Sequence, residues 1–156
     1  MPPSTVSAVA SKAKDCRAFE DGADRVRILV SGDQTGGAYS IMEWIAAPFS
    51  EAAQDSFGTH IHGTYEETFL VLDGALTFLL EDHVLDLEAG DLVAVPPNTR
   101  HGYVNRSGAP TKLLVTFRPA GMEELFYNHR TDQAVVPDQQ AFLDIAARDH
   151  ASFYEV

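Results

Sequence analysis

Short runs of apolar residues, several of them alternating with polar ones and all separated by turn residues, fill most of the chain. Successive side chains of a strand point to opposite faces, so alternation predicts strands with one buried face. The expected strands cover residues 25–30, 39–46, 68–72, 75–80, 84–87, 92–95, 103–105 and 112–117. Many short strands with turns between them favour a β-sandwich or barrel over alternating strands and helices.

Turn residues mark the ends of these strands. Asp73-Gly74 stands between two apolar runs, and this dipeptide is a strong local signal for a β-hairpin. Residues 88–91 form a second predicted turn, and the composition of residues 31–37 predicts a loop.

The two ends of the chain depart from the strand pattern. We expect residues 1–24 to form an arm that is tied down as an edge strand. Two helices are predicted, at residues 121–127 and 138–149, and the second has an amphipathic pattern. The predicted organisation is therefore an arm (1–24), a β-barrel domain (25–119) and a helical tail (120–156) that packs on the barrel or on a partner subunit.

Length and charge narrow the possible functions. A chain of 156 residues with 45% hydrophobic residues suffices for one domain with one core. Its formal net charge is -12, with 11 basic residues against 23 acidic ones. Binding to nucleic acids or to anionic membranes requires basic residues, so neither partner is expected.

Cysteine usage and hydropathy indicate the compartment. Cys16 is the single cysteine, so an intrachain disulfide is impossible. The first residues lack the basic and apolar regions of a secretory signal, and no apolar stretch is long enough to span a membrane. We therefore expect a cytoplasmic protein.

Candidate chemistry begins with His60 and His62. Residues two apart on a strand share a face, so both imidazoles can point into one space and bind a transition metal. A nearby glutamate would add a carboxylate oxygen. Glu67 shares its face with the apolar Phe69, whereas Glu66 points the other way, so parity favours Glu67.

A fourth ligand would have to come from a distant strand, and His101 is the candidate. On its own, a His-x-His pair is short, and two surface histidines with an unrelated third would give the same pattern. The residues around these histidines distinguish the two interpretations.

The first segment resembles cupin motif one, in which His-x-His is followed by a glutamate and, seven residues later, by a glycine. Glu67 and Gly74 have this spacing, whereas Glu66 does not.

The second segment is similar to cupin motif two, in which a glycine, a proline, a histidine and an asparagine follow at set distances. Gly90, Pro96, His101 and Asn105 match, and Asn98 replaces the usual glycine. Asparagine tolerates the left-handed backbone region better than most residues, so this departure is mild.

The resemblance implies an all-β cupin fold, a double-stranded β-helix or jelly-roll barrel, with short C-terminal helices added. It implies one divalent metal ion, for which iron, manganese, nickel, copper, cobalt and zinc all fit the donor set. It assigns Asn105, Gly74 and Gly90 structural roles. The implied metal ligands are His60, His62, Glu67 and His101.

Residues 117–126 and 142–150 resemble the tails of quercetinase-like (flavonol dioxygenase) cupins. This resemblance implies a metal-dependent dioxygenase of a small aromatic or enolic substrate. Glu67 would accept the substrate's proton as general base, and dioxygen would then add to the electron-rich ring.

Two alternatives remain open. The first is a non-redox polyketide cyclase or isomerase, in which the metal acts as a Lewis acid and Tyr103 or a histidine moves protons. Tyr103 lies two residues after His101, although a packed core tyrosine fits its position equally well. The second is a cupin that binds a small ligand without catalysis. By resemblance to cupins of this size, we expect a homodimer.

Overall fold

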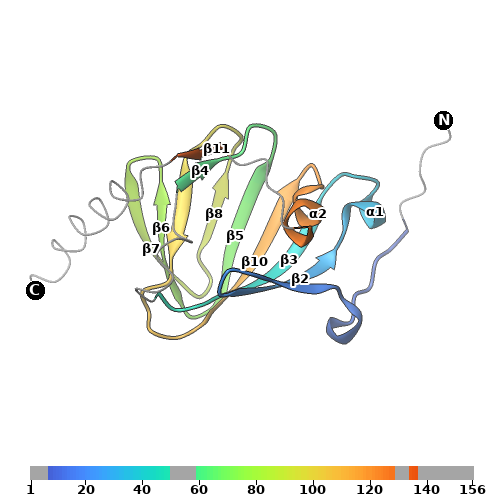
Figure 1. The fold of residues 1–156 in the computed structure, drawn as a ribbon, viewed down its shortest axis with the longest axis horizontal. Coiled ribbons are helices and arrows are strands. Elements are labelled where there is room, and N and C mark those ends of the chain that lie inside the picture. The colour runs from blue at the N-terminus through green and yellow to red at the C-terminus, as the bar shows by residue number, and fades with distance from the viewer. Residues whose placement is uncertain (1–6, 50–58, 129–133, 137–156) are drawn as a thin grey trace, which may run out of the picture.

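The computed structural model describes residues 7–49, 59–128 and 134–136 and shows two antiparallel sheets facing each other (Figure 1). Sheet A contains, in spatial order, β1 (Ala18–Asp21), β2 (Asp24–Val30), β3 (Ser40–Ala46), β10 (Thr111–Arg118), β5 (Glu66–Asp73) and β8 (Leu92–Val95). Sheet B contains β11 (Ala134–Val136), β4 (Thr59–Ile61), β9 (His101–Val104), β6 (Ala75–Leu80) and β7 (His83–Glu88). The helical elements are η1 (Ala13–Asp15), α1 (Gly32–Thr35) and α2 (Met122–Tyr127).

This architecture confirms the predicted all-β jelly roll, and each predicted strand is present with ends shifted by at most a few residues. The expected edge strand is β1, which pairs with β2 from Ala18 to Asp21. The predicted helix at residues 121–127 is α2, whereas the one at residues 138–149 lies outside the described residues. Among the residues described, no helix has the length and apolar character needed to cross a membrane.

The hairpin predicted at Asp73-Gly74 is wrong. The strand before it, β5, pairs with β10 and β8 in sheet A, whereas the strand after it, β6, belongs to sheet B. The chain crosses between sheets here, close against β10. Gly74 has φ +91°, and a Cβ on it would lie 2.8 Å from Oγ1 of Thr111, so this crossing requires glycine.

The predicted turn at residues 88–91 also connects the two sheets, because it joins β7 to β8. The connection between them, from β6 to β7, is a paired hairpin in which Leu80 lies opposite His83. Its turn contains Glu81 with φ 54° and carries no glycine. A search for glycine-containing turns therefore selects the connection from β5 to β6 instead of the hairpin from β6 to β7.

The loop predicted at residues 31–37 contains the short helix α1, which is a second correction. The Ser31 backbone N–H donates to Oε1 of Gln34 at 3.0 Å, and the two residues form a capping box. The Ser-x-x-Gln spacing is the sequence signal for such a box, but the glycines in the same segment favour a loop.

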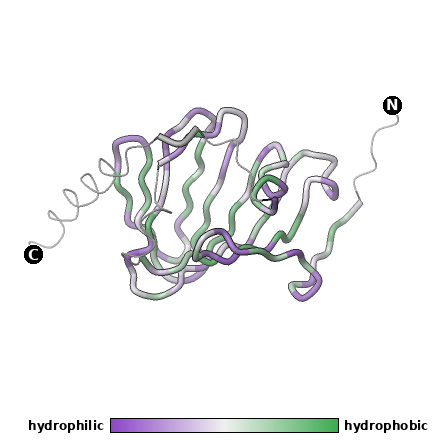
Figure 2. Tube along the Cα trace, in the orientation of Figure 1, coloured by the Kyte–Doolittle hydropathy of each residue, from purple (hydrophilic) through white to green (hydrophobic). Residues whose placement is uncertain are grey.

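The hydrophobic core lies between the sheets. Along β3 and β10 every second residue is buried, and Met42, Phe117 and Leu113 have no measurable exposure. Figure 2 shows hydrophobic residues along the strands of both sheets and hydrophilic ones in many of the connections. The alternation seen in the sequence is therefore the alternation between core and solvent.

A buried carboxylate anchors α2. Glu123 is 1% exposed, and its two oxygens accept hydrogen bonds from the backbone N–H groups of Gly32 and Gly121, each at 2.7 Å. It thus connects the start of α1 to the start of α2. From α2, Phe126 packs edge-on against Trp44 of β3, with ring centroids 5.4 Å apart.

The Glu123 anchor predicts a stability effect. Replacing Glu123 by glutamine keeps the side chain's size but turns an amide group toward one of the two N–H donors. We expect the free energy of unfolding to fall by about 1–3 kcal/mol, measured by denaturant unfolding.

Glu124→Gln is the matched control, because the Glu124 side chain is 42% exposed and pairs with Arg17 at the surface. Loss of such a surface pair costs less than about 1 kcal/mol. Equal losses in the two variants would contradict the anchoring role of Glu123.

Candidate metal centre

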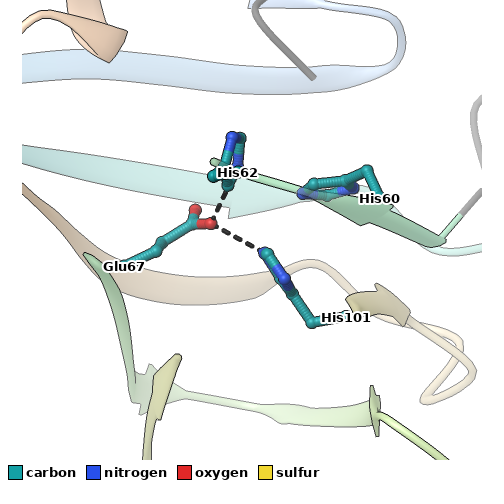
Figure 3. A group of neighbouring side chains, drawn as sticks. All are labelled: His60, His62, Glu67 and His101. Carbon is teal, nitrogen blue, oxygen red and sulfur yellow. Dashed lines mark hydrogen bonds and ion pairs between the residues drawn. The ribbon is translucent and has the colours of Figure 1, made fainter. Parts of the chain in front are cut away.

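Three strands from the two sheets bring the predicted ligands together. In sheet B, His60 of β4 pairs directly with His101 of β9, and His62 follows immediately after β4. Glu67 comes from β5 of sheet A. The group therefore lies inside the barrel, where the two sheets face each other (Figure 3).

The four side chains are close enough to share one ion. Each offers one ligand atom, and these atoms all lie within 4.8 Å of one another. Ligands at about 2.1 Å from a metal ion lie up to roughly 4.2 Å apart, so the group needs only small adjustments to hold one. His62 and His101 are each 1% exposed and Glu67 is 5% exposed, whereas His60 is half-buried.

The parity argument for Glu67 agrees with the structure. Glu67, Phe69 and Val71 all point into the barrel and are buried. Glu66 points outward, where its carboxylate accepts a hydrogen bond from the Arg118 guanidinium at 3.1 Å. The structure thus places Glu67, and not Glu66, among the candidate ligands.

Hydrogen bonding sets the charge of Glu67. Its Oε2 lies 2.9 Å from Nε2 of His101 and 3.2 Å from Nε2 of His62 (Figure 3). Burial by itself raises the pKa of Glu67, but the hydrogen bonds from His101 and His62 outweigh burial and lower the pKa below its ordinary value. The two imidazoles therefore favour the ionised form of Glu67.

The tautomer of His101 points to a cation at this position. Nδ1 of His101 lies 2.9 Å from the Thr99 carbonyl oxygen, which only accepts, so Nδ1 carries a proton. On a neutral ring, Nε2 then has a lone pair facing the carboxylate of Glu67. Two acceptors at this distance require either a second proton on the ring or a metal ion between them. The donor set therefore fits a divalent metal.

Residues of the second motif hold the two histidine segments together. Asn98 has φ 63°, as its replacement of the usual glycine predicts, and its backbone N–H donates to the carbonyl of His62 at 2.8 Å. The amide of Asn105 donates to the carbonyls of Ala46 and Ala109, which confirms its structural role.

Aromatic rings surround the ligands. The ring of Phe78 stacks on His101 at 6.2 Å between centroids, with an interplanar angle of 15°. On the other side, Phe117 packs edge-on against His62 at 5.6 Å, and Tyr65 does so at 6.3 Å. These rings make the immediate surroundings of the ligands apolar.

The hydroxyl of Tyr103 has its hydrogen-bond partner outside the ligand group. Its hydroxyl donates to Oδ2 of Asp24 at 2.8 Å, and the same oxygen accepts from the indole N–H of Trp44 at 2.8 Å. Burial, and then the negative charge of Asp24, raise the pKa of Tyr103 well above its usual value, so it remains a phenol. Sequence reasoning missed Asp24, because nothing near it in the chain indicates a partner on β9.

Comparison with known proteins supports the assignment of the fold. Residues 50–117 match the cupin domain family. An uncharacterized protein of Methanocaldococcus jannaschii, MJ1618, is 32% identical over 60 residues, which cover 38% of this chain and 48% of that protein. The chain therefore aligns with only about half the length of this relative.

Several solved structures share the fold at low sequence identity. The nucleoside dehydratase Pac13 from Streptomyces aligns with a TM-score of 0.62 and 18% identity, covering 83% of this chain and 92% of Pac13. KdgF from Halomonas aligns with a TM-score of 0.64 and 16% identity, covering 76% of this chain and 100% of KdgF. The polyketide cyclase RemF from Streptomyces resistomycificus aligns with a TM-score of 0.58 and 20% identity, covering 72% of this chain and 80% of RemF.

These structural matches establish the fold, while the family match covers the region that contains His60, His62, Glu67 and His101. The two sheets and the order of the two motifs thus agree with the match of residues 50–117 to the cupin domain family.

Proposed function

We propose that this protein is a metal-dependent enzyme that acts on a small aromatic or enolic substrate. The observation that carries this proposal is the buried group of His60, His62, Glu67 and His101, in which one carboxylate faces two imidazoles. A purely structural core gains nothing from burying this many polar groups, because their desolvation is costly.

His60, His62, Glu67 and His101 would hold the metal ion. When bound, a divalent ion polarises a carbonyl or lowers the pKa of a hydroxyl placed next to it. Because His60 alone among the four is half-buried, we infer that the substrate approaches the centre from the His60 side.

Glu67 would act as the general base. Its carboxylate faces two imidazole nitrogens, in a position to take a proton from a substrate hydroxyl or from a carbon next to a carbonyl. The rings of Phe117 and Tyr65 on the His62 side would orient an aromatic substrate and limit the access of water.

Non-redox proton transfer is the chemistry that we favour. Pac13 is described as a nucleoside dehydratase and RemF as a polyketide cyclase, and both share this fold. Both kinds of reaction move protons, and Glu67 is the carboxylate of the ligand group that would accept one here. A proton-transfer role for Tyr103 stays a prediction, and it would require the hydroxyl to leave Asp24.

Flavonol dioxygenation is the second candidate. Its support is the resemblance of residues 117–126 to quercetinase-like cupins. In the structure this segment contains the end of β10 and most of α2. Its Phe117 contacts His62, and its Phe126 packs against Phe117. Both chemistries use the same ligands and the same base, and they differ in whether dioxygen is consumed.

Metal content tests the centre without relying on activity. We expect purified protein to bind about one divalent ion per chain, since four donors converge on one point, as measured by elemental analysis. His101→Ala should lose most of this metal. His83→Ala is the control, because His83 is exposed and lies outside the group. Equal metal content in both variants would contradict the assigned site.

Dioxygen distinguishes the two chemistries. Metal-loaded protein is incubated with flavonols and with reactive polyketides, with and without dioxygen, while oxygen uptake and products are followed. Turnover that persists without oxygen supports non-redox catalysis. Turnover that requires oxygen and incorporates it into the product supports the dioxygenase instead, and the absence of turnover with either substrate class contradicts the proposed enzyme.

Glu67→Gln tests the base. The variant should fold and bind substrate but lose activity by at least about a hundredfold, since glutamine cannot accept the proton. Glu66→Gln, one residue away and facing outward, should retain nearly full activity. Loss of activity in the Glu66 variant alone would show that the assignment of the base is wrong.

A further inference from the structure

Two side chains of β9 reach across the barrel to sheet A. His101 faces Glu67 of β5, with 2.9 Å between Nε2 and Oε2. Two residues further along, the Tyr103 hydroxyl donates to Oδ2 of Asp24, the first residue of β2, at 2.8 Å. The first contact belongs to the ligand group, whereas the second lies outside it. A short strand of sheet B is therefore connected to sheet A by both His101 and Tyr103.

Asp24 is a fixed acceptor for the Tyr103 hydroxyl. Its Oδ2 also accepts from the indole N–H of Trp44, and its Oδ1 accepts from the backbone N–H of Ala47, each at 2.8 Å. Trp44 belongs to β3 and Ala47 follows β3 directly, so these two donors are part of sheet A or adjoin it. Hydrogen bonds to both oxygens hold a carboxylate in one orientation. Asp24 thus gives Tyr103 a rigid attachment point on sheet A.

Backbone pairing fixes β9 within its own sheet. Along one edge, β9 pairs with β6 over its whole length, so that Tyr103 lies opposite Phe78. Along the other edge, its pairing with β4 is limited to His101 opposite His60. These bonds run within the plane of sheet B, so they do not set its distance from sheet A. At β9 that distance depends on side chains that cross the barrel.

Aromatic packing connects the position of Tyr103 to that of His101. The ring of Phe69 lies 6.1 Å from the ring of His101 and 6.2 Å from the ring of Tyr103, measured between centroids. Phe78, opposite Tyr103, stacks on His101. A close-packed interior transmits displacements, because it has little empty space to absorb them. A shift of the Tyr103 ring would therefore also move the imidazole of His101.

We propose that Tyr103 is a positioning residue of the metal centre. Through its hydrogen bond to Asp24, it sets where β9, and with it His101, lies relative to Glu67. The contact between His101 and Glu67 cannot do this, because an ion held by both ligand atoms would separate them. The bond from Tyr103 to Asp24 involves no ligand atom, so it stays in place when an ion binds. This inference rests on the proposed metal site and not on the reaction proposed for it.

Tyr103→Phe tests this role, because it removes the hydroxyl and keeps the ring. The probe is Co²⁺, which binds to imidazole and carboxylate ligands and whose visible absorption depends on their geometry. We expect the variant to fold and to bind Co²⁺ about tenfold more weakly than the wild-type chain, as measured by competition with a chelator. At saturating Co²⁺ its absorption spectrum should also change. A loss of stability alone would lower the folded fraction but leave the spectrum of each bound ion unchanged.

Trp44→Phe is the matched control, because it removes the other side-chain donor to Oδ2 of Asp24 but changes β3 and not β9. It should keep the wild-type affinity and spectrum. In an Asp24→Ala background, Tyr103→Phe should weaken Co²⁺ binding no further, because the acceptor of the hydroxyl is already absent.

Unchanged Co²⁺ binding and spectrum in Tyr103→Phe would overturn the positioning role, and so would an equal change in Trp44→Phe. A wild-type chain that binds no Co²⁺ would overturn this role together with the metal centre. A failure to find turnover concerns the proposed enzyme alone, because none of these measurements uses a substrate.

Discussion

The structure depends on one buried interaction, the carboxylate of Glu67 facing Nε2 of both His62 and His101. A charge in the core is stable only when it is compensated by opposite charge and hydrogen bonds. The imidazoles come from sheet B and the carboxylate from sheet A, so this interaction also connects the two layers. From outside the group, the Thr99 carbonyl accepts from Nδ1 of His101 and orients that imidazole, while the Asn98 backbone N–H donates to the His62 carbonyl and holds its segment.

The contact between Glu67 and the two histidines also explains why the connections between the sheets are tight. Glu67 reaches the histidines only if β5 lies in sheet A while the next strand, β6, lies in sheet B. Gly74 makes this crossing, pressed against Thr111 of β10. A paired hairpin at this point would place β5 and β6 in one sheet and would separate Glu67 from His101.

The sequence predicts local features of a strand well, but it does not predict features that depend on residues far apart in the chain. Alternation predicted the strands, and the spacing from Glu67 to Gly74 predicted which glutamate faces inward, because both are local properties of one strand. The pairing of strands is not local, so Asp73-Gly74 was interpreted as a hairpin. The hydrogen bond from Tyr103 to Asp24 joins residues 79 positions apart, and no pattern near either residue indicates it.

The strand β5 is held on both of its edges, because it pairs with β10 on one side and with β8 on the other. Within these pairs, Glu67 lies opposite Phe117 of β10 and Val95 of β8. The position of a ligand depends on the rigidity of its strand. Sheet A therefore fixes Glu67 from both sides, while the histidines approach it from the facing sheet.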